Sequence, residues 1–372
     1  MFGLLTACLV VLSIDSNLQT VSVPFEFERY QAHVHKLSNK KEPNPPKWPS
    51  SVRVFRPTDT DVEAITGAAF KLNGGHCSPS NTGLECPPGQ WSTHRFAFLF
   101  LPGHYAADVP VGFYTEVAGL GRSPDDVVFT GEFGVYHEEG AFNFTVGALD
   151  DFWRSASNFH TQTTANWMGN QGMLWAVSQA SPLRRIHVEN DLSLYEYQPR
   201  AVLAGYASGG FMTDSVVEGK VWAGGQQQWL TRTSSLGGWN GIVWNGVFVG
   251  TNGAPETHCN EYWSPNMEPY QNVPQTPTVT VEKPYIVADA AGNKFELVIP
   301  SPRPAGSVGP IPNWTSPDDV VVDFSGVYVA NNETDTATII NAKLAAGLHV
   351  VLAPGIYTLQ TSLSLNHPNQ VK

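Results

Sequence analysis

One sequence pattern occurs near the start of the chain and again near its end. The apolar run Phe98–Leu101 is followed by Pro-Gly, one further residue and Tyr105. The run His349–Ala353 is followed in the same order by Pro-Gly, one residue and Tyr357. The two Pro-Gly pairs, at positions 102 and 354, are 252 residues apart, which suits two tandem domains that begin alike. Because only 15 residues follow Tyr357, we expect the second domain to be truncated.

Short apolar runs separated by Gly, Asn, Ser and Asp fill the chain from Asp126 to Gly250. Helical spacing of apolar residues is nearly absent there, so the pattern predicts strands. Bulky residues recur at irregular intervals of 15 to 36 positions, which is typical of stacked β coils with loops of varied length; they are Trp153, Trp175, Phe211, Trp229 and Trp244. A sandwich would need regular hairpins, which the sequence lacks. We therefore predict an all-β fold, a parallel β-helix with the start of a second one at the C-terminus.

The predicted organisation has five segments. They are residues 1–17, a candidate signal peptide; 18–54, an extended leader; 55–262, the first β-helix domain; 263–317, a Pro-rich bridge with a β-hairpin; and 318–372, the truncated start of the second β-helix domain. Within them, Asp61–Leu72 and Asp335–Ala346 are expected helices, each lying before one copy of the repeated pattern. The apolar run Phe2–Ile14 lacks a basic leader and is shorter than the roughly 20 residues of a membrane span.

Charge and composition limit the partners of this chain. The formal net charge is -12 and no basic stripe is present, so nucleic acid and anionic membranes are not expected partners. No Cys/His spacing matches a zinc site, and we predict no metal and no cofactor. A neutral partner fits the acidic balance better, and the apolar run Phe2–Ile14 resembles the apolar region of a secretory signal, so we expect secretion.

Four cysteines and three glycosylation sequons bear on the compartment. Cys77 and Cys86 flank a polar loop and predict a disulfide in an oxidising compartment, with two free thiols as the alternative; Cys8 and Cys259 are the others. The sequons begin at Asn143, Asn313 and Asn332 and permit glycosylation of a secreted chain.

The repeated pattern carries a family resemblance. Asp335–Tyr357, with its helix, glycine, apolar strand and Pro-Gly-x-Tyr, resembles the opening of pectate-lyase-like right-handed parallel β-helix domains. Two such openings in one chain are similar to the tandem β-helix arrangement of the family 55 glycoside hydrolases, the exo-β-1,3-glucanases. Leu174–Leu183 also resembles the Trp-x-x-x-Gln-Ala stretch of their first β-helix. The resemblance implies a general acid on the second β-helix, beyond Lys372, and a role for Gln179 in holding the attacking water.

Three shorter stretches are similar to secreted, mostly actinobacterial proteins. They are Gly112–Gly121, Phe152–Ser155 and Gln227–Arg232. Some proteins of that kind carry an adenylyl cyclase label, but this sequence has neither a phosphate cradle nor paired metal-binding aspartates in a cyclase context.

Carboxylates within the β runs are candidate catalytic groups. Glycosidic hydrolysis needs one carboxyl to protonate the leaving oxygen and a second group to activate water or attack the sugar. Asp214 and Glu218 lie in or beside a β run, and positions 214, 216 and 218 would share one face of an extended strand. The alternative is that they are solvent-facing charges or turn caps.

Aromatic side chains are candidate sugar-binding groups because exposed Trp rings stack on sugar faces. The candidates for substrate binding are Trp175, Trp229 and Trp244, together with Arg232 as a hydrogen-bond donor. Packing inside the coils is the alternative for each Trp, and neutralisation of a nearby carboxylate is the alternative for Arg232. The sequence therefore predicts a secreted, glucan-directed glycoside hydrolase-like protein. Its alternatives are a non-catalytic glycan-binding or wall-associated scaffold and a polysaccharide lyase.

Overall fold

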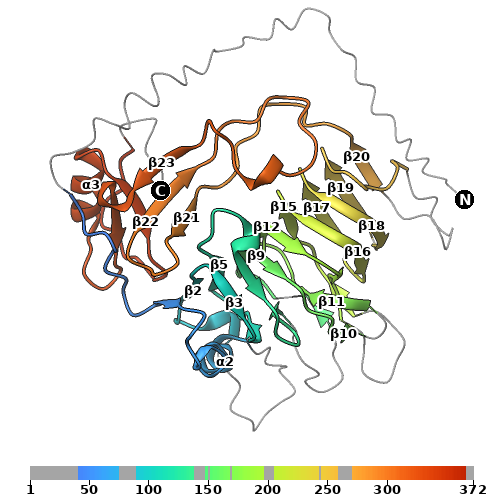
Figure 1. The fold of residues 1–372 in the computed structure, drawn as a ribbon, viewed down its shortest axis with the longest axis horizontal. Helices are drawn as coiled ribbons and strands as arrows, with labels where there is room; N and C mark the ends of the chain where they lie inside the picture. Colours follow the sequence, from blue (N-terminus) through green and yellow to red (C-terminus); the bar gives the residue numbers. More distant parts are fainter. Residues whose placement is uncertain are drawn as a thin grey trace, which may run out of the picture.

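A row of short parallel strands, each paired with the next along the chain, dominates the structure (Figure 1). It is a computed structural model that describes residues 41–74, 89–137, 147–149, 151–167, 170–196, 205–242, 244–258 and 270–365. In order of pairing the strands are β1 (Val52–Phe55), β2 (Phe96–Phe100), β5 (Thr115–Gly119), β9 (Ser155–Thr161), β12 (Leu183–Val188), β15 (Phe211–Thr213), β17 (Gln228–Arg232), β19 (Asn245–Val249) and β20 (Tyr270–Val273).

Paired residues in this row are far apart in sequence, so the chain travels around a coil before each new strand. From β2 to β20 the separation ranges from 17 positions, Gln228 opposite Asn245, to 39, Glu116 opposite Ser155. A second group of strands joins the same sheet; its members are β3 (Gly103–Tyr105), β6 (Val127–Phe129), β10 (Asn166–Trp167), β11 (Asn170–Leu174), β13 (Asp191–Ser193), β16 (Val216–Gly224) and β18 (Ser235–Gly241). The prediction of a mostly β protein with parallel strands is confirmed.

Small elements complete the first part of the molecule. Two further parallel pairs are β4 (Val109–Pro110) with β7 (Val135–Tyr136), and β8 (Gly147–Ala148) with β14 (Tyr206–Ala207). The helical elements are α2 (Val62–Asn73), η1 (Gly89–Trp91) and η2 (Pro124–Asp126). No helix in the described part of the chain is both long and apolar enough to span a membrane.

The coils bend at a column of residues with left-handed backbone conformation. The φ angles are 55° at Asn158, 50° at Arg185, 48° at Asp214 and 42° at Thr233. Each residue directly follows one of the aligned positions Ser157, Arg184, Thr213 and Arg232, which the strand register places opposite one another. Left-handed backbone at one level of each coil turns the chain sharply, so consecutive coils bend in the same place.

Every second side chain of a strand points inward, and these side chains fill the interior of the coils. The rings of Phe100, Phe129 and Phe159 meet edge to face, with centroid distances of 4.9 and 5.5 Å. Trp175 and Phe248 are fully buried in the same cluster. The stack therefore has a continuous apolar interior. Aromatic contacts of this kind stabilise it beyond the effect of the area they bury.

The chain after β20 forms smaller sheets that lie against β2 and β5 in Figure 1. An antiparallel sheet contains β21 (Tyr285–Ala288), β22 (Phe295–Ile299) and β23 (Val320–Asp323). It is followed by β24 (Val327–Ala330), α3 (Ala337–Ala345) and β25 (His349–Leu352), and β24 pairs with β25 in parallel. The remaining helical turns are η3 (Pro312–Trp314) and η4 (Phe324–Gly326). Ala97 and Leu99 of β2 pack with Leu297 and Val322 of this sheet in one buried cluster.

The repeated Pro-Gly pattern makes the same contacts in both copies. The Tyr105 hydroxyl is 2.7 Å from the carbonyl oxygen of Leu101 and 3.0 Å from that of the last residue of β1. The Tyr357 hydroxyl is 2.9 Å from the carbonyl oxygens of Ala353 and of the last residue of β24. The order strand, helix and parallel strand is also shared, since β1, α2 and β2 correspond to β24, α3 and β25.

Residues 274–284 and 300–314, here called the arm, connect the far end of the strand row to the β21–β22–β23 sheet (Figure 1). The two segments run antiparallel, with Thr280 paired to Arg303. The backbone N–H of Gly309 donates to the carbonyl of Gly250 at 2.8 Å. The arm therefore lies along the corner column and is held to it by hydrogen bonds.

Candidate functional site

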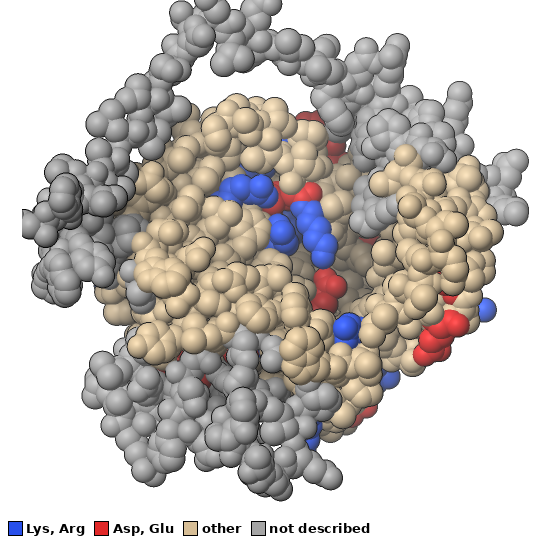
Figure 2. Space-filling model, turned by 180° about the vertical axis from the view of Figure 1, so that it is seen from behind, with Lys and Arg blue, Asp and Glu red and all other residues tan. Residues whose placement is uncertain are grey.

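Two adjoining cavities of about 370 and 440 Å³ lie between the outer face of the strand row and the later part of the chain, which contributes β21, β22, β25 and the segment after β25. Both are lined by Glu116 and by Leu352, Ala353 and Pro354, so they form one continuous cleft. Figure 2 shows a hollowed face of the molecule where basic and acidic side chains gather.

The floor of the cleft is built from side chains that point outward from successive coils. The register aligns Glu116 with Ser155, and it aligns Ser157 with Arg184 and then with Thr213 and Arg232. Glu116, Ser155, Ser157 and Arg184 line the two cavities. Further along the same row Thr213 is fully buried and Arg232 pairs with Glu282 of the arm, so the cleft gathers polar groups only from residues 116 to 184.

One end of the cleft carries an aromatic platform. The Tyr114 and Trp153 rings are stacked with centroids 5.4 Å apart and an interplanar angle of 9°. The Arg95 guanidinium lies 3.5 Å from the Tyr114 ring centroid, and burial lowers the pKa of Arg95. Trp153 is 42% exposed, and Tyr114 and Trp153 both have left-handed backbone, with φ of 54° and 55°. Strained backbone of this kind clusters at functional sites, and here it holds the exposed Trp153 ring against the half-buried Tyr114 ring.

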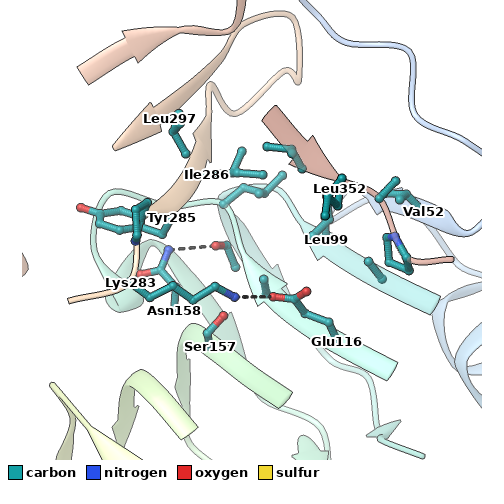
Figure 3. Close-up of a pocket in the computed structure, with 18 of the residues that line it drawn as sticks. Val52, Leu99, Glu116, Ser157, Asn158, Lys283, Tyr285, Ile286, Leu297 and Leu352 are labelled. Atoms are coloured by element: carbon teal, nitrogen blue, oxygen red, sulfur yellow. Dashed lines mark hydrogen bonds and ion pairs between the residues drawn. The ribbon is translucent and has the colours of Figure 1, made fainter. Parts of the chain in front are cut away.

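The other end of the cleft is lined largely by aliphatic side chains, among them Leu99, Ile286 and Leu297, with a few charged groups beside them (Figure 3). Lys283 Nζ of the arm is 3.3 Å from Glu116 Oε1 of β5, and Figure 3 shows this ion pair spanning the cavity. The Arg184 guanidinium lies 4.8 Å from the Phe211 ring. Burial lowers the pKa of Arg184, while Glu282 opposes that shift and Arg232 adds to it. The cleft therefore combines aromatic faces with hydrogen-bond donors and one carboxylate, an arrangement suited to a polar ring-shaped ligand.

Gln179, the residue assigned to hold water, is exposed just before Ala180, which lines the second cavity. Its side chain is held by Ser208, because Ser208 Oγ donates to Gln179 Oε1 at 3.0 Å and Gln179 Nε2 donates to the Ser208 carbonyl. The amide is thus fixed at the border of the cleft.

Asp214 and Glu218 do not share a strand face as predicted. β15 ends at Thr213 and β16 begins at Val216, and the left-handed Asp214 between them turns the chain. Asp214 is fully buried, and its carboxylate lies 3.3 Å from Arg185 Nη1 and accepts a hydrogen bond from the N–H of Ile311 at 2.7 Å. Burial raises the pKa of Asp214, and Arg185 opposes this shift. Glu218 is half exposed and contacts His187 instead, with 2.9 Å between Oε1 and Nε2.

The predicted sugar-binding residues divide between the interior and the surface. Trp175 is fully buried and donates from Nε1 to the Ser181 carbonyl at 3.1 Å, and Trp229 is 2% exposed, so both rings pack in the core instead of facing a ligand. Trp244 is 55% exposed but does not line either cavity. Arg232 Nη2 is 2.8 Å from Glu282 Oε2, which corresponds to the neutralising alternative.

Several predicted modification sites fall outside the described residues, namely Cys77, Cys86 and Asn143. Of the other two sequons, Asn313 is exposed and Asn332 is half-buried. Arg95, Tyr114 and Lys283 line the cleft but were not predicted as site residues. Tyr114 and Glu116 lie in Gly112–Gly121, one of the stretches similar to secreted proteins. That similarity pointed to these residues but did not indicate that they line a cleft.

No protein-family model matches the chain. It is 35% identical over 322 residues, 86% of its length, to a protein named exo-β-1,3-glucanase from Streptomyces sp. (strain SirexAA-E / ActE), of which the match covers 47%. Among solved structures it is similar to sacteLam55A from Streptomyces sp. SirexAA-E, with a TM-score of 0.70 and 34% identity over 87% of this chain and 51% of that one.

A variant of sacteLam55A in complex with glucose gives a TM-score of 0.69 and 34% identity, over 86% of this chain and 51% of that chain. None of these three carries an adenylyl cyclase name. The chain spans about half the length of the relatives it matches, and over most of its own length it is similar in sequence and fold to a Streptomyces exo-β-1,3-glucanase.

Proposed function

We propose that this chain is the glucan-binding half of a family 55-like glycoside hydrolase that acts on β-1,3-glucan. The observation that carries the proposal is the 35% identity to an exo-β-1,3-glucanase over 322 residues. The glucose bound to a variant of the similar structure supports a saccharide ligand.

The composition of the cleft supports the same ligand class. The stacked rings of Tyr114 and Trp153 offer an apolar face to the C–H groups of a sugar ring. Ser155, Ser157 and Arg184 supply hydroxyl and guanidinium groups for the hydroxyls of a sugar. A neutral polysaccharide also fits a chain of net charge -12, which would repel a polyanion.

The cleft supplies only part of the chemistry of hydrolysis. Glu116 is the one carboxylate among the described residues that line the two cavities. A glycosidase needs a second group to activate water or to protonate the leaving oxygen. In the proposed mechanism Gln179 orients the attacking water from the border of the cleft, and the general acid comes from outside the residues described here.

The proposal extends to the fold and to the compartment. Parallel pairing of strands 17 to 39 residues apart supports a right-handed β-helix, because nearly all parallel crossovers are right-handed. The second β24–α3–β25 unit supports a second β-helix that begins in this chain. Secretion is proposed from the apolar run Phe2–Ile14 and from the sequons.

The test measures binding and cleavage separately. We expect the purified chain to bind the β-1,3-glucan laminarin in isothermal titration calorimetry and to bind β-1,4- and α-1,4-glucans at least tenfold more weakly. Release of glucose is then measured for the chain and for the longest product of its reading frame. Equal affinity for all three glucans, or no binding to any, would contradict the proposal.

A second candidate is a non-catalytic glycan-binding scaffold. It is favoured by the single carboxylate among the described cleft residues. Binding of laminarin without release of sugar from either protein product would favour this scaffold over the hydrolase.

A further inference from the structure

A cluster of metal-binding side chains lies away from the cleft, on three consecutive segments of the strand stack. His160 of β9 and His187 of β12 occupy paired positions, and their rings stack with centroids 4.1 Å apart and an interplanar angle of 14°. Asp125 of η2 faces both rings. One ligand atom from each of these three residues lies within 4.8 Å of the other two.

The carboxylate of Asp125 is fixed before any ligand arrives. Its Oδ2 accepts a hydrogen bond from Ser123 Oγ at 3.3 Å, and the capping box of η2 holds the surrounding backbone. Its Oδ1 is 2.6 Å from His187 Nδ1 and 3.4 Å from His160 Nδ1. A single carboxylate oxygen is therefore shared between two imidazole nitrogens.

Glu218 orients the second imidazole. Its Oε1 is 2.9 Å from His187 Nε2, so the proton of a neutral His187 is expected on Nε2. The Nδ1 lone pair would then face Asp125 Oδ1 at 2.6 Å, so either a proton or a metal ion must lie between the two atoms. A carboxylate that holds one nitrogen of an imidazole while the other binds metal is a recurrent arrangement in metalloproteins.

A proton between His187 and Asp125 leaves the rest of the cluster unsatisfied. His160 Nδ1 is 3.4 Å from the shared oxygen, at the limit of a hydrogen bond, and the buried His160 Nε2 has no hydrogen-bond partner among the described residues. A metal ion can accept several donors at once, with bonds of about 2.0–2.2 Å to imidazole nitrogen and carboxylate oxygen. Two imidazoles and one carboxylate suit Zn²⁺ and related transition metals.

We propose that Asp125, His160 and His187 bind a divalent transition-metal ion, with Glu218 as the positioning residue behind His187. Glu189, directly after β12, adds to the negative charge around His160. The ligands come from three segments that are consecutive layers of the stack. The ion would link these layers at the surface and leave one coordination position for water.

The experiment titrates the metal-free chain with Zn²⁺ by isothermal titration calorimetry at pH 7.5, after treatment with a chelator. We expect one site that is lost in the double variant His160→Gln/His187→Gln. Glu218→Gln is expected to weaken binding 10- to 100-fold, which is the usual effect of removing a group behind a metal ligand. His104→Gln, which alters an exposed histidine outside the cluster, serves as the matched control and should leave the affinity unchanged.

Two results would overturn the proposal: absence of Zn²⁺ binding by the wild-type chain, or equal binding by the double variant. Far-UV circular dichroism checks that each variant is folded. If the double variant does not fold, Glu218→Gln decides, because its side chain is 54% exposed and its replacement leaves the core intact. Unchanged Zn²⁺ affinity in Glu218→Gln would then contradict the proposed site, in which Glu218 positions His187.

Discussion

The hydroxyl of Tyr105 lies 2.7 Å from the carbonyl oxygen of Leu101, four residues earlier and on the other side of the Pro-Gly turn. Tyr357 and Ala353 repeat this relationship 252 positions later, at 2.9 Å. Burial raises the pKa of Tyr357 to about 12, so its hydroxyl stays neutral and can donate a hydrogen bond. The tyrosine thus fixes the turn that follows each of the two corresponding strands.

Replacing Tyr105 by Phe is expected to lower the free energy of unfolding by about 1–2 kcal/mol, because a buried hydrogen bond is lost while the ring still packs. The measurement is urea-induced unfolding followed by tryptophan fluorescence. Tyr206→Phe, at a 58% exposed position, is the control and should change stability by less than about 0.5 kcal/mol. Equal effects of the two replacements would show that the Tyr105 hydroxyl does not stabilise the turn.

Asp214→Asn is expected to destabilise the chain by about 3 kcal/mol, because it leaves the buried Arg185 guanidinium without its carboxylate. An amide keeps one oxygen for the Ile311 N–H, so release of the arm is expected in Asp214→Ala, which removes both oxygens. Hydrogen exchange at Ile311 measures that release directly. Asp318→Asn, in an exposed stretch of the chain, is the control, and protection of Ile311 should persist in it.

Trp153→Ala is expected to weaken laminarin binding about tenfold, equivalent to a loss of roughly 1.4 kcal/mol, because a sugar can stack on its exposed ring. Trp244→Ala removes a comparably exposed ring outside the two cavities and should leave the dissociation constant unchanged. Both constants are measured by calorimetry on the same preparation of glucan. The reverse order of effects would place the sugar at Trp244 and contradict the cleft assignment.

The pH dependence of stability is expected to contain a contribution from His349. Burial lowers its pKa from 6.5 to about 4, so the folded state resists the proton that the unfolded state takes up. The contribution of His349 to the free energy of unfolding is fully present above about pH 6.5. It decreases by up to about 3 kcal/mol as the pH falls toward 4. His349→Leu should therefore have a smaller difference in unfolding free energy between pH 7 and pH 4.5 than the wild type. His104→Gln, the exposed control, should keep the wild-type slope, and an unchanged slope in His349→Leu would refute the assignment.

The repeated pattern and the run of short strands made the mostly β class predictable. The strands from β6 to β19 lie within the stretch Asp126–Gly250, for which strands were predicted. The expected helix Asp61–Leu72 is α2, which spans Val62–Asn73. These elements depend on local apolar spacing, which a sequence displays directly.

The cleft was less predictable because its residues come from different coils. The register that aligns Ser157 with Arg184 depends on loop lengths, and these do not follow from local spacing. The irregular series of bulky residues mixed side chains from both faces of the strands: Trp175 and Trp229 are buried inside the coils, whereas Trp153 is exposed. A shift of one residue moves a side chain to the other face, so spacing near twenty could not distinguish the two.

The variation in coil length has a consequence for how such a protein can change. Successive coils take between 17 and 39 residues to return to the next aligned position, yet the aligned strands keep their pairing. Additional residues must therefore be accommodated outside the paired strands, at the edges of a layer, and they leave the layers above and below in place. New loops can be added next to the cleft one layer at a time, so ligand preference can diverge among relatives while the stacked scaffold persists.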